Sequence, residues 1–405
     1  MNEGAAAALA APRRVVSIDI FRGLTMCVMI FVNALSEVNG LPWWTYHARE
    51  RSNVMTYVDM VFPFFLFIVG MSMPLSVEQR LKRNSSQLAL WAHVLLRALG
   101  LVVLGLILAN TDFCDTAHTG MNGSLWGLLA LVSAGLYLNA YPATPRFRKL
   151  GPVLRGVGLV GVIALLAIFR RTTPHGHMAW LDFNYPEILG LIGLSYAGAS
   201  LLYLPTRRWR WAPLFWFAIS TAFCVLNTAQ RLTYVDNLSQ YVWVFYNGAM
   251  ISLMMAGAAT TTLYLRDGAK QPPKQAILLG CGLAVVALAA GAALMPLGIS
   301  KLSETPTWAL WSAGAAMLAF ALLYWICDVK QWTKWAFFVR SAGANTLTTY
   351  LLPDLWSFAI GAIGFTWLDN RWNLGTPGVV KTLVFTAAIL ALSRLVTRLG
   401  VRLRF

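Results

Sequence analysis

The chain has 405 residues, of which 58% are hydrophobic and only 12% are charged, and its 32 Lys and Arg against 16 Asp and Glu give a net charge of +16. A soluble globular protein carries about 25% charged residues, so the composition excludes a soluble enzyme, a disordered chain and a disulfide scaffold. It predicts an all-α polytopic membrane protein. The basic excess has two interpretations, a nucleic-acid surface or the positive residues of cytoplasmic loops, and the order of charges along the chain separates them.

Apolar stretches that approach the roughly 20 residues needed to cross a bilayer recur along the whole chain. In chain order we predict about 12 spans (roughly 11 to 13), at 17–36, 56–77, 88–109, 123–141, 151–169, 186–205, 211–228, 243–265, 275–296, 306–327, 341–363 and 378–399. The eleventh is the least regular, because Pro353 and Asp354 interrupt it. We expect a cytoplasmic tail at 1–16, a single transmembrane bundle at 17–400 and a short cytoplasmic end at 401–405.

The positive residues fall unevenly on the two sides of such a bundle. With twelve spans, alternate loops share a side, and one side then holds 22 of the 32 Lys and Arg while the other holds 8. Arg22 and Arg97 are the two that fall within spans. Since positive residues concentrate in cytoplasmic loops, both termini are predicted to be cytoplasmic. The net charge is then explained by topology, and we expect the lipid bilayer and no nucleic acid as a partner.

Three charged residues lie at the predicted inner ends of spans. Asp19 and Arg22 are one helical turn apart in span 1, and Arg97 lies in span 3. One interpretation is a local ion pair with an arginine that reaches the membrane surface. The other is an anion-binding site that faces the cytoplasm, with Arg97 as its second positive charge.

Two amides are placed within or at the end of spans. Asn33 lies near the outer end of span 1 and Asn345 in the inner half of span 11. Because an amide in hydrocarbon needs hydrogen-bond partners, we expect both side chains to point into the bundle.

The predicted outer loop between spans 1 and 2 is rich in aromatic and polar residues. It contains Trp43, Trp44 and His47, and Asp59 follows at the start of span 2. The tryptophans suit either an interfacial belt or stacking on a sugar ring. Asp59 suits either a helix N-terminus or the orientation of a histidine.

Other motifs are missing. The histidines 175 and 177 share one loop but have no Cys, Asp or Glu at a metal-ligand spacing, so no metal site is predicted. The sequence has no P-loop, no dinucleotide-binding glycine motif after a strand, no HExxH and no GxSxG. An ATP-driven pump and a serine hydrolase are therefore not supported.

The series of motifs around span 1 resembles the heparan-α-glucosaminide N-acetyltransferase family, particularly its bacterial members. The resemblance rests on SIDIFRGLTMCVMIFVNAL at 17–35, then His47, then VDMVFPFFLFIVGMSMPLS at 58–76. Further matching segments are PEILGLIGLSY at 186–196, ALLYWICDVKQWTKW at 321–335 and GANTLTTYLLPDLW at 343–356. Two departures are GSLWGLL at 123–129 in place of the family's GVLQR stretch, and Pro353 in place of a histidine.

The resemblance implies a membrane acyltransferase in a bacterial cytoplasmic (inner) membrane, with a possible homodimer. Such proteins move an acetyl group from cytoplasmic acetyl-CoA to the amine of a glucosamine on the far side. The family's essential histidine falls on His47, and its span-end asparagine and the acid before FPxF fall on Asn33 and Asp59. We therefore predict these three as catalytic. The predicted donor site holds Asp19, Arg22, Arg97 and Asn345, and the predicted acceptor site holds Trp43, Trp44 and Lys301.

Three alternatives stay open at this stage. Transfer can reach an amine or a hydroxyl, and it can be direct or pass through an acetylated histidine. A transporter of N-acetylglucosamine or a related solute would also have twelve spans and a broken helix. A structural or assembly partner in the envelope is the third class.

Overall fold

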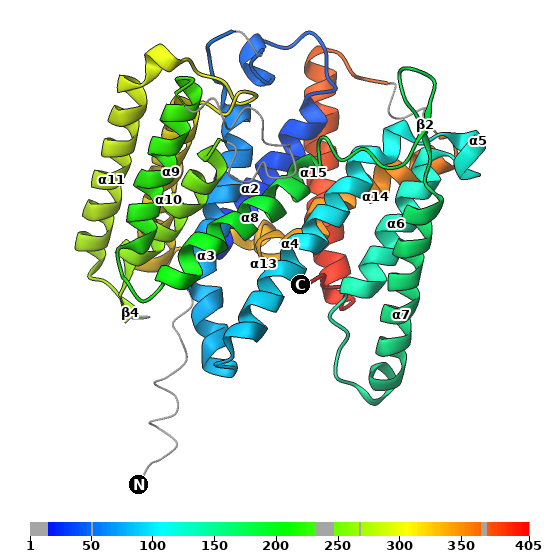
Figure 1. Cartoon of the computed structure of the whole chain (residues 1–405), viewed down its shortest axis with the longest axis horizontal. Helices are drawn as coiled ribbons and strands as arrows, with labels where there is room; N and C mark the ends of the chain where they lie inside the picture. Colours follow the sequence, from blue (N-terminus) through cyan, green and yellow to red (C-terminus); the bar gives the residue numbers. More distant parts are fainter. Residues whose placement is uncertain (1–14, 50–51, 232–246, 267–268, 366–370, 405) are drawn as a thin grey trace.

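The computed structural model describes residues 15–49, 52–231, 247–266, 269–365 and 371–404. Within these residues the chain is almost entirely α-helical, with two short hairpins as its only paired strands (Figure 1). The long helices are α2 (Val16–Leu35), α3 (Val61–Arg83), α4 (Gln87–Asn110), α6 (Gly123–Leu138), α7 (Pro145–Ile168), α8 (Glu187–Thr206), α9 (Ala212–Thr228), α10 (Ala249–Tyr264), α11 (Pro273–Ala293), α12 (Pro306–Tyr324), α14 (Thr346–Ala362) and α15 (Gly375–Arg398). Each coincides with one of the predicted spans.

The connecting segments contain only short elements. These are 3-10 turns at Trp43–Thr45, Tyr57–Met60, Thr111–Phe113, Met295–Leu297 and Lys334–Phe338, a π turn at Trp325–Val329, the helices α5 (Thr116–Thr119) and α13 (Arg340–Ala344), and the strands β1 (Arg171–Thr172), β2 (Met178–Ala179), β3 (Leu265–Arg266) and β4 (Ala269–Lys270). In the described part of the chain, eight helices are long and apolar enough to cross a membrane. The prediction of an all-α polytopic membrane protein is confirmed.

The loops gather at the two ends of the helices, as alternate spans require. The loop over residues 36–56 and the loop over 298–305 lie at one end, hereafter the His47 end (Figure 1). At the opposite end the C-terminal segment pairs with the loop after α6, where the amide of Ala140 donates to the carbonyl of Arg402 over 2.9 Å. The His47 end corresponds to the predicted outer side. Its orientation toward the cell exterior stays a prediction.

Small residues let α3 and α10 approach closely at the centre of the structure. A Cβ atom at Gly70 would overlap the carbonyl of Met254, and one at Gly257 would overlap the carbonyl of Phe67. Because glycine brings helix backbones together where lipid offers no hydrophobic gain, this contact fixes α3, which carries Asp59 at its start, against the core.

We predict that Gly70→Ala destabilises the protein. The added methyl must displace backbone atoms, and overpacking of this kind costs about 1–3 kcal/mol. The apparent Tm of the variant in detergent should fall relative to Gly282→Ala, since a Cβ at Gly282 on α11 meets nothing within 4 Å. Equal Tm values for the two variants would contradict the packing described here.

The irregular span near the C-terminus breaks at a different residue from the one predicted. Helix α14 continues through Pro353, whereas the break lies at Asn345, with φ −129° and ψ 54°, between α13 and α14. The Asn345 amide donates to Thr397 Oγ1 (3.1 Å) and to the carbonyl of Val401 (2.9 Å). The prediction of a break at Pro353 was wrong, because the helix accommodates this proline, and the break lies instead at Asn345, whose side chain is anchored to the C-terminal segment.

Candidate active site

A histidine and a buried aspartate form a hydrogen-bonded pair at the His47 end. His47 Nδ1 lies 2.7 Å from Asp59 Oδ1, and Asp59 is only 1% exposed. An ionised carboxylate can only accept, so Nδ1 is the donor. The lone pair of Nε2 is then directed away from Asp59, which is the arrangement of a base held by an orienting acid.

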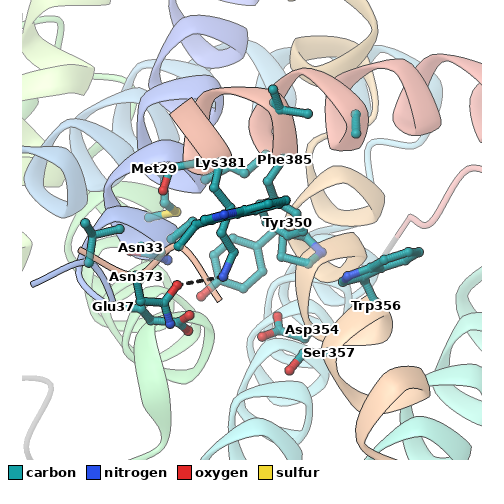
Figure 2. A pocket seen from close by; sticks show the side chains of 18 of the residues that line it. Met29, Asn33, Glu37, Tyr350, Asp354, Trp356, Ser357, Asn373, Lys381 and Phe385 are labelled. Carbon is teal, nitrogen blue, oxygen red and sulfur yellow. Dashed lines mark hydrogen bonds between the residues drawn. The ribbon is translucent and has the colours of Figure 1, made fainter. Parts of the chain in front are cut away.

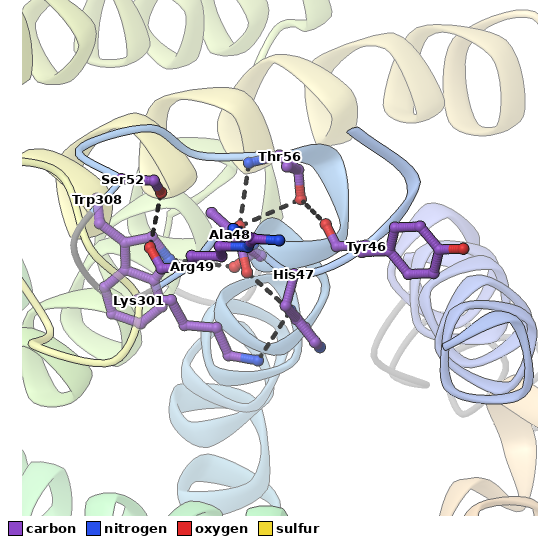
Figure 3. A network of polar contacts seen from close by, with 9 residues as sticks. Tyr46, His47, Ala48, Arg49, Ser52, Thr56, Lys301 and Trp308 are labelled. Carbon is purple, nitrogen blue, oxygen red and sulfur yellow. Dashed lines mark hydrogen bonds and ion pairs between the residues drawn. The ribbon is translucent and has the colours of Figure 1, made fainter. Parts of the chain in front are cut away.

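The 3-10 turn Tyr57–Met60, which precedes α3, and the loop around Ala48 and Thr56 hold the carboxylate of Asp59 in place (the labelled residues of this network are shown in Figure 3). Its second oxygen, Oδ2, accepts from the amides of Ala48 (3.1 Å) and Thr56 (3.0 Å) and lies 3.1 Å from Thr56 Oγ1. Thr56 and Asp59 form a reciprocal capping box. Trp308 on α12 adds a hydrogen bond from Nε1 to the Asp59 carbonyl over 3.1 Å. The helix start and the loop therefore fix His47 together.

Lys301 completes this cluster from the loop before α12. Its Nζ lies 3.5 Å from His47 Nδ1. Since Nδ1 already donates to Asp59, the contact between Lys301 and His47 is electrostatic and is not a well-formed hydrogen bond. The pKa of Lys301 is lowered by burial, and the carboxylates of Asp59 and Glu187 offset only part of this effect.

The loop that carries His47 and the loop that carries Lys301 are joined by a further hydrogen bond. Asn53 Oδ1 accepts from the amide of Ile299 over 2.6 Å and holds the two loops together.

A cavity of about 1210 Å³ lies between the halves of α2, α14 and α15 nearest the His47 end (Figure 2). Its polar lining includes Asn33, Glu37, Asp112, Glu187, Tyr350, Asp354, Ser357, Asn373 and Lys381. Tyr350 donates from its hydroxyl to Glu187 Oε2 (3.1 Å), and Lys381 Nζ donates to Asn373 Oδ1 (2.7 Å).

A hydrogen bond joins the segment around His47 to the lining of this cavity. The Tyr46 hydroxyl, next to His47 in the chain, donates to the carbonyl of Val38, which lines the cavity, over 2.6 Å. Asn33, which was expected to point into the bundle, also lines the cavity, and its side chain is exposed.

The predicted acceptor aromatics lie away from the cavity. Trp43 and Trp44 are 66% and 52% exposed, and Trp44 has Tyr57 as a ring neighbour at 6.3 Å. The cavity walls instead contain Trp356 and Trp372. The sequence patterns assigned no role to Glu187 or Asp354. Both are acids at the start of or within an apolar stretch, and this is the same signal that identified Asp59.

The predicted donor residues make separate contacts at the opposite end. Arg22 Nη1 lies 3.5 Å from Asp19 Oδ1 and donates to the carbonyl of Gly343 (3.2 Å), and its Nη2 donates to Ser72 Oγ (2.6 Å). The guanidinium of Arg97 lies over the ring of Tyr196 at 4.6 Å. These contacts agree with the local ion-pair interpretation of Asp19 and Arg22, and a donor site here stays a prediction.

Glu304, near Lys301 in the loop before α12, offers a test of stability against pH. Burial raises the pKa of this carboxyl to about 8 from 4.5. The folded state then binds a proton more tightly than the unfolded state, so stability declines as pH rises from about 4.5 to 8. Glu304→Gln should remove this loss, and its Tm should exceed that of the wild type at pH 8 by more than at pH 5. Parallel curves of Tm against pH would contradict it.

In the described residues, no group of three His, Cys, Asp or Glu side chains is placed to hold a metal ion. The fold and the site define a polytopic α-helical membrane protein with a histidine–aspartate pair, next to which Tyr46 hydrogen-bonds to the cavity-lining residue Val38. A family model described as a domain of unknown function (DUF5009) matches residues 14–261, which is more than half of the chain. The protein belongs to this family.

The chain is also similar to curated relatives over a shorter region. It is 37% identical to heparan-alpha-glucosaminide N-acetyltransferase of Homo sapiens over 105 residues, and 37% identical to that of Mus musculus over 97 residues. These matches cover 26% and 24% of this chain, but only 15% and 14% of the relatives. The family resemblance seen in the motifs is confirmed, over a small part of the relatives' length.

Proposed function

We propose that the protein is a membrane acetyltransferase that takes an acetyl group from acetyl-CoA on the cytoplasmic side. It places that group on an amine or hydroxyl of a glucosamine-like sugar at the His47 end. The acceptor type is suggested by the name of the curated relatives. We further propose that the protein works in a bacterial cytoplasmic membrane, as a homodimer.

The single observation that carries the proposal is the hydrogen-bonded His47–Asp59 pair. The acceptor nitrogen or oxygen attacks the carbonyl carbon of the thioester, and His47 Nε2 removes its proton as the new bond forms. The carbon–sulfur bond then breaks, and the proton passes to the leaving thiolate. With an ammonium acceptor, the reaction releases one further proton.

Asn33 and Lys301 suit supporting roles in this chemistry. The tetrahedral intermediate carries a negative oxygen, which donors stabilise. Asn33 presents an amide to the cavity, and Lys301 places a positive charge next to His47. In the alternative route, Nε2 itself attacks the thioester, releases the thiolate and transfers the acetyl group to the acceptor in a second step.

The donor would approach from the opposite end. Coenzyme A is a polyanion, and arginine binds phosphate through paired, fixed donors. We assign this role to Arg22 and Arg97, with Asp19 and Asn345 as neighbouring polar groups. Trp43 and Trp44 remain proposed contacts for the acceptor outside the cavity.

Purified protein in detergent tests the activity. Acetyl-CoA and glucosamine are supplied together, thiol release is followed spectroscopically and the acetylated sugar is identified by mass spectrometry. We expect both products in equal amounts. Absence of both would contradict the proposal, and uptake of labelled N-acetylglucosamine into vesicles without acetyl-CoA would favour a transporter.

A further inference from the structure

The cavity near His47 changes character with depth. Toward the His47 end its lining includes the carboxylates of Glu37, Asp112 and Glu187. Toward the middle of α2 and α15 the lining is apolar and consists of residues such as Met26, Ile30, Phe385 and Ala388. Such a lining suits a molecule with a polar head and a hydrocarbon part.

One wall of the cavity is formed by residues on exposed helix faces. Val380 and Val384 on α15 and Trp356 on α14 line the cavity, yet they are 54%, 64% and 44% exposed. Exposed apolar side chains along a cavity wall suit contact with the acyl chains of a bilayer. We take this wall as the side of the cavity that opens toward lipid.

The course of α14 explains the opening. Near the opposite end α14 and α15 meet, where Thr349 Oγ1 and Ser393 Oγ lie 2.6 Å apart. From there α14 runs away along α6, while α15 continues toward the His47 end (Figure 1). Their diverging halves leave between them the space that the cavity occupies.

The charge at the polar end favours a cation. Four carboxylates line the cavity, those of Glu37, Asp112, Glu187 and Asp354, and the lysine among the lining residues, Lys381, already donates to Asn373. Such an excess of acidic over basic side chains attracts an ammonium group. Val38, which follows Glu37 in the chain and also lines the cavity, accepts the hydrogen bond of the Tyr46 hydroxyl, so this end of the cavity adjoins the His47 cluster.

We propose that the acceptor is an amino sugar carried on a hydrocarbon lipid. Its ammonium group binds among Glu187, Asp354 and Glu37, and its hydrocarbon chain leaves the cavity between α14 and α15 into the bilayer. This inference rests on the proposed acetyltransferase function, and it names the acceptor class for the same site.

The test compares two acceptors that differ only in their tail, methyl glucosaminide and dodecyl glucosaminide, with the protein reconstituted in phosphatidylcholine nanodiscs. We expect kcat/KM to be at least about tenfold higher for the dodecyl acceptor. The burial of two methylene groups is already enough for a tenfold gain in binding, and the dodecyl chain has more. Equal values would overturn the inference while leaving the acetyltransferase function intact. Transfer to neither acceptor would overturn the function itself.

Variants at the opening separate entry through the wall from simple partitioning of the tail into lipid. Val384→Trp and Ala388→Phe narrow the opening and should reduce the preference for the dodecyl acceptor. Leu383→Trp is the matched control, because Leu383 is 53% exposed on the same helix without being a lining residue. A preference that survives in both narrowing variants, with unchanged Tm, would overturn the inference.

Binding measured without acetyl-CoA gives a second readout. Dodecyl glucosaminide should raise the Tm of the wild type, whereas dodecyl N-acetylglucosaminide, which lacks the cationic amine, should raise it less. Nanodiscs that contain phosphatidylethanolamine distinguish a sugar acceptor from an ordinary lipid amine. Acetylated phosphatidylethanolamine as the main product would overturn the sugar assignment.

Discussion

Replacing His47 by alanine is expected to lower the rate of acetyl transfer by about 10²- to 10⁴-fold, the usual contribution of a general base. The variant removes His47 Nε2, the atom whose free lone pair can take a proton. Asp59 cannot replace it as a base, because its oxygens already accept hydrogen bonds from His47, Ala48 and Thr56. The rate of thiol release from acetyl-CoA in the presence of glucosamine measures the effect. Since His47 is half exposed, its loss should leave the Tm nearly unchanged.

The chain supplies a matched control for this variant. His118 pairs with Asp115 through Nδ1 and Oδ1 at 3.1 Å, on α5, away from the residues that line the cavity. His118→Ala should retain full activity. Full activity in His47→Ala, or an equal loss in both variants, would contradict the catalytic role of His47.

The second large effect is expected from Asp59→Asn. The amide can still accept from Ala48 and Thr56 through its oxygen, but its NH₂ group then faces His47 Nδ1. The imidazole must shift its proton to Nε2, and the catalytic lone pair is lost. Loss of one hydrogen bond to a charged acceptor, about 1.5–3 kcal/mol, corresponds to about a 10- to 100-fold lower rate.

Asp59 acts through His47, so its test needs a readout that a purely structural residue would not change. The pH–rate profile of Asp59→Asn should differ in shape from that of the wild type, because its imidazole no longer has a carboxylate to stabilise the protonated form. Asp115→Asn provides the control, since hydrogen bonds from the Thr172 hydroxyl and from His118 lower the pKa of Asp115 to about 2, and Asp115 does not line the cavity. A profile with unchanged shape would show that Asp59 only supports the fold.

The helices were predictable because the long helices are mainly apolar stretches between polar loops. This signal is local, and the described helices coincide with the predicted spans. The one misplaced break could not be located from a local signal. A proline inside a helix suggests an interruption, but the break lies eight residues earlier, at Asn345, whose amide is bound to Thr397 and Val401 far along the chain.

The His47–Asp59 pair was predictable for a similar reason, since the two residues are twelve positions apart in one motif. The cavity was not. Its walls combine Asn33, Glu187, Asp354 and Lys381, which lie on four different helices. No local pattern records that these side chains converge, and only the divergence of α14 from α15 creates the space between them.

The most direct test of the central claim is transfer across a sealed membrane. The protein is reconstituted into vesicles in known orientation, with labelled acetyl-CoA on the side of the C-terminal segment and glucosamine on the side of His47. We predict labelled N-acetylglucosamine on the His47 side, and none in vesicles that contain His47→Ala. Product that forms only when donor and acceptor share one side, or no product in either arrangement, would contradict the account.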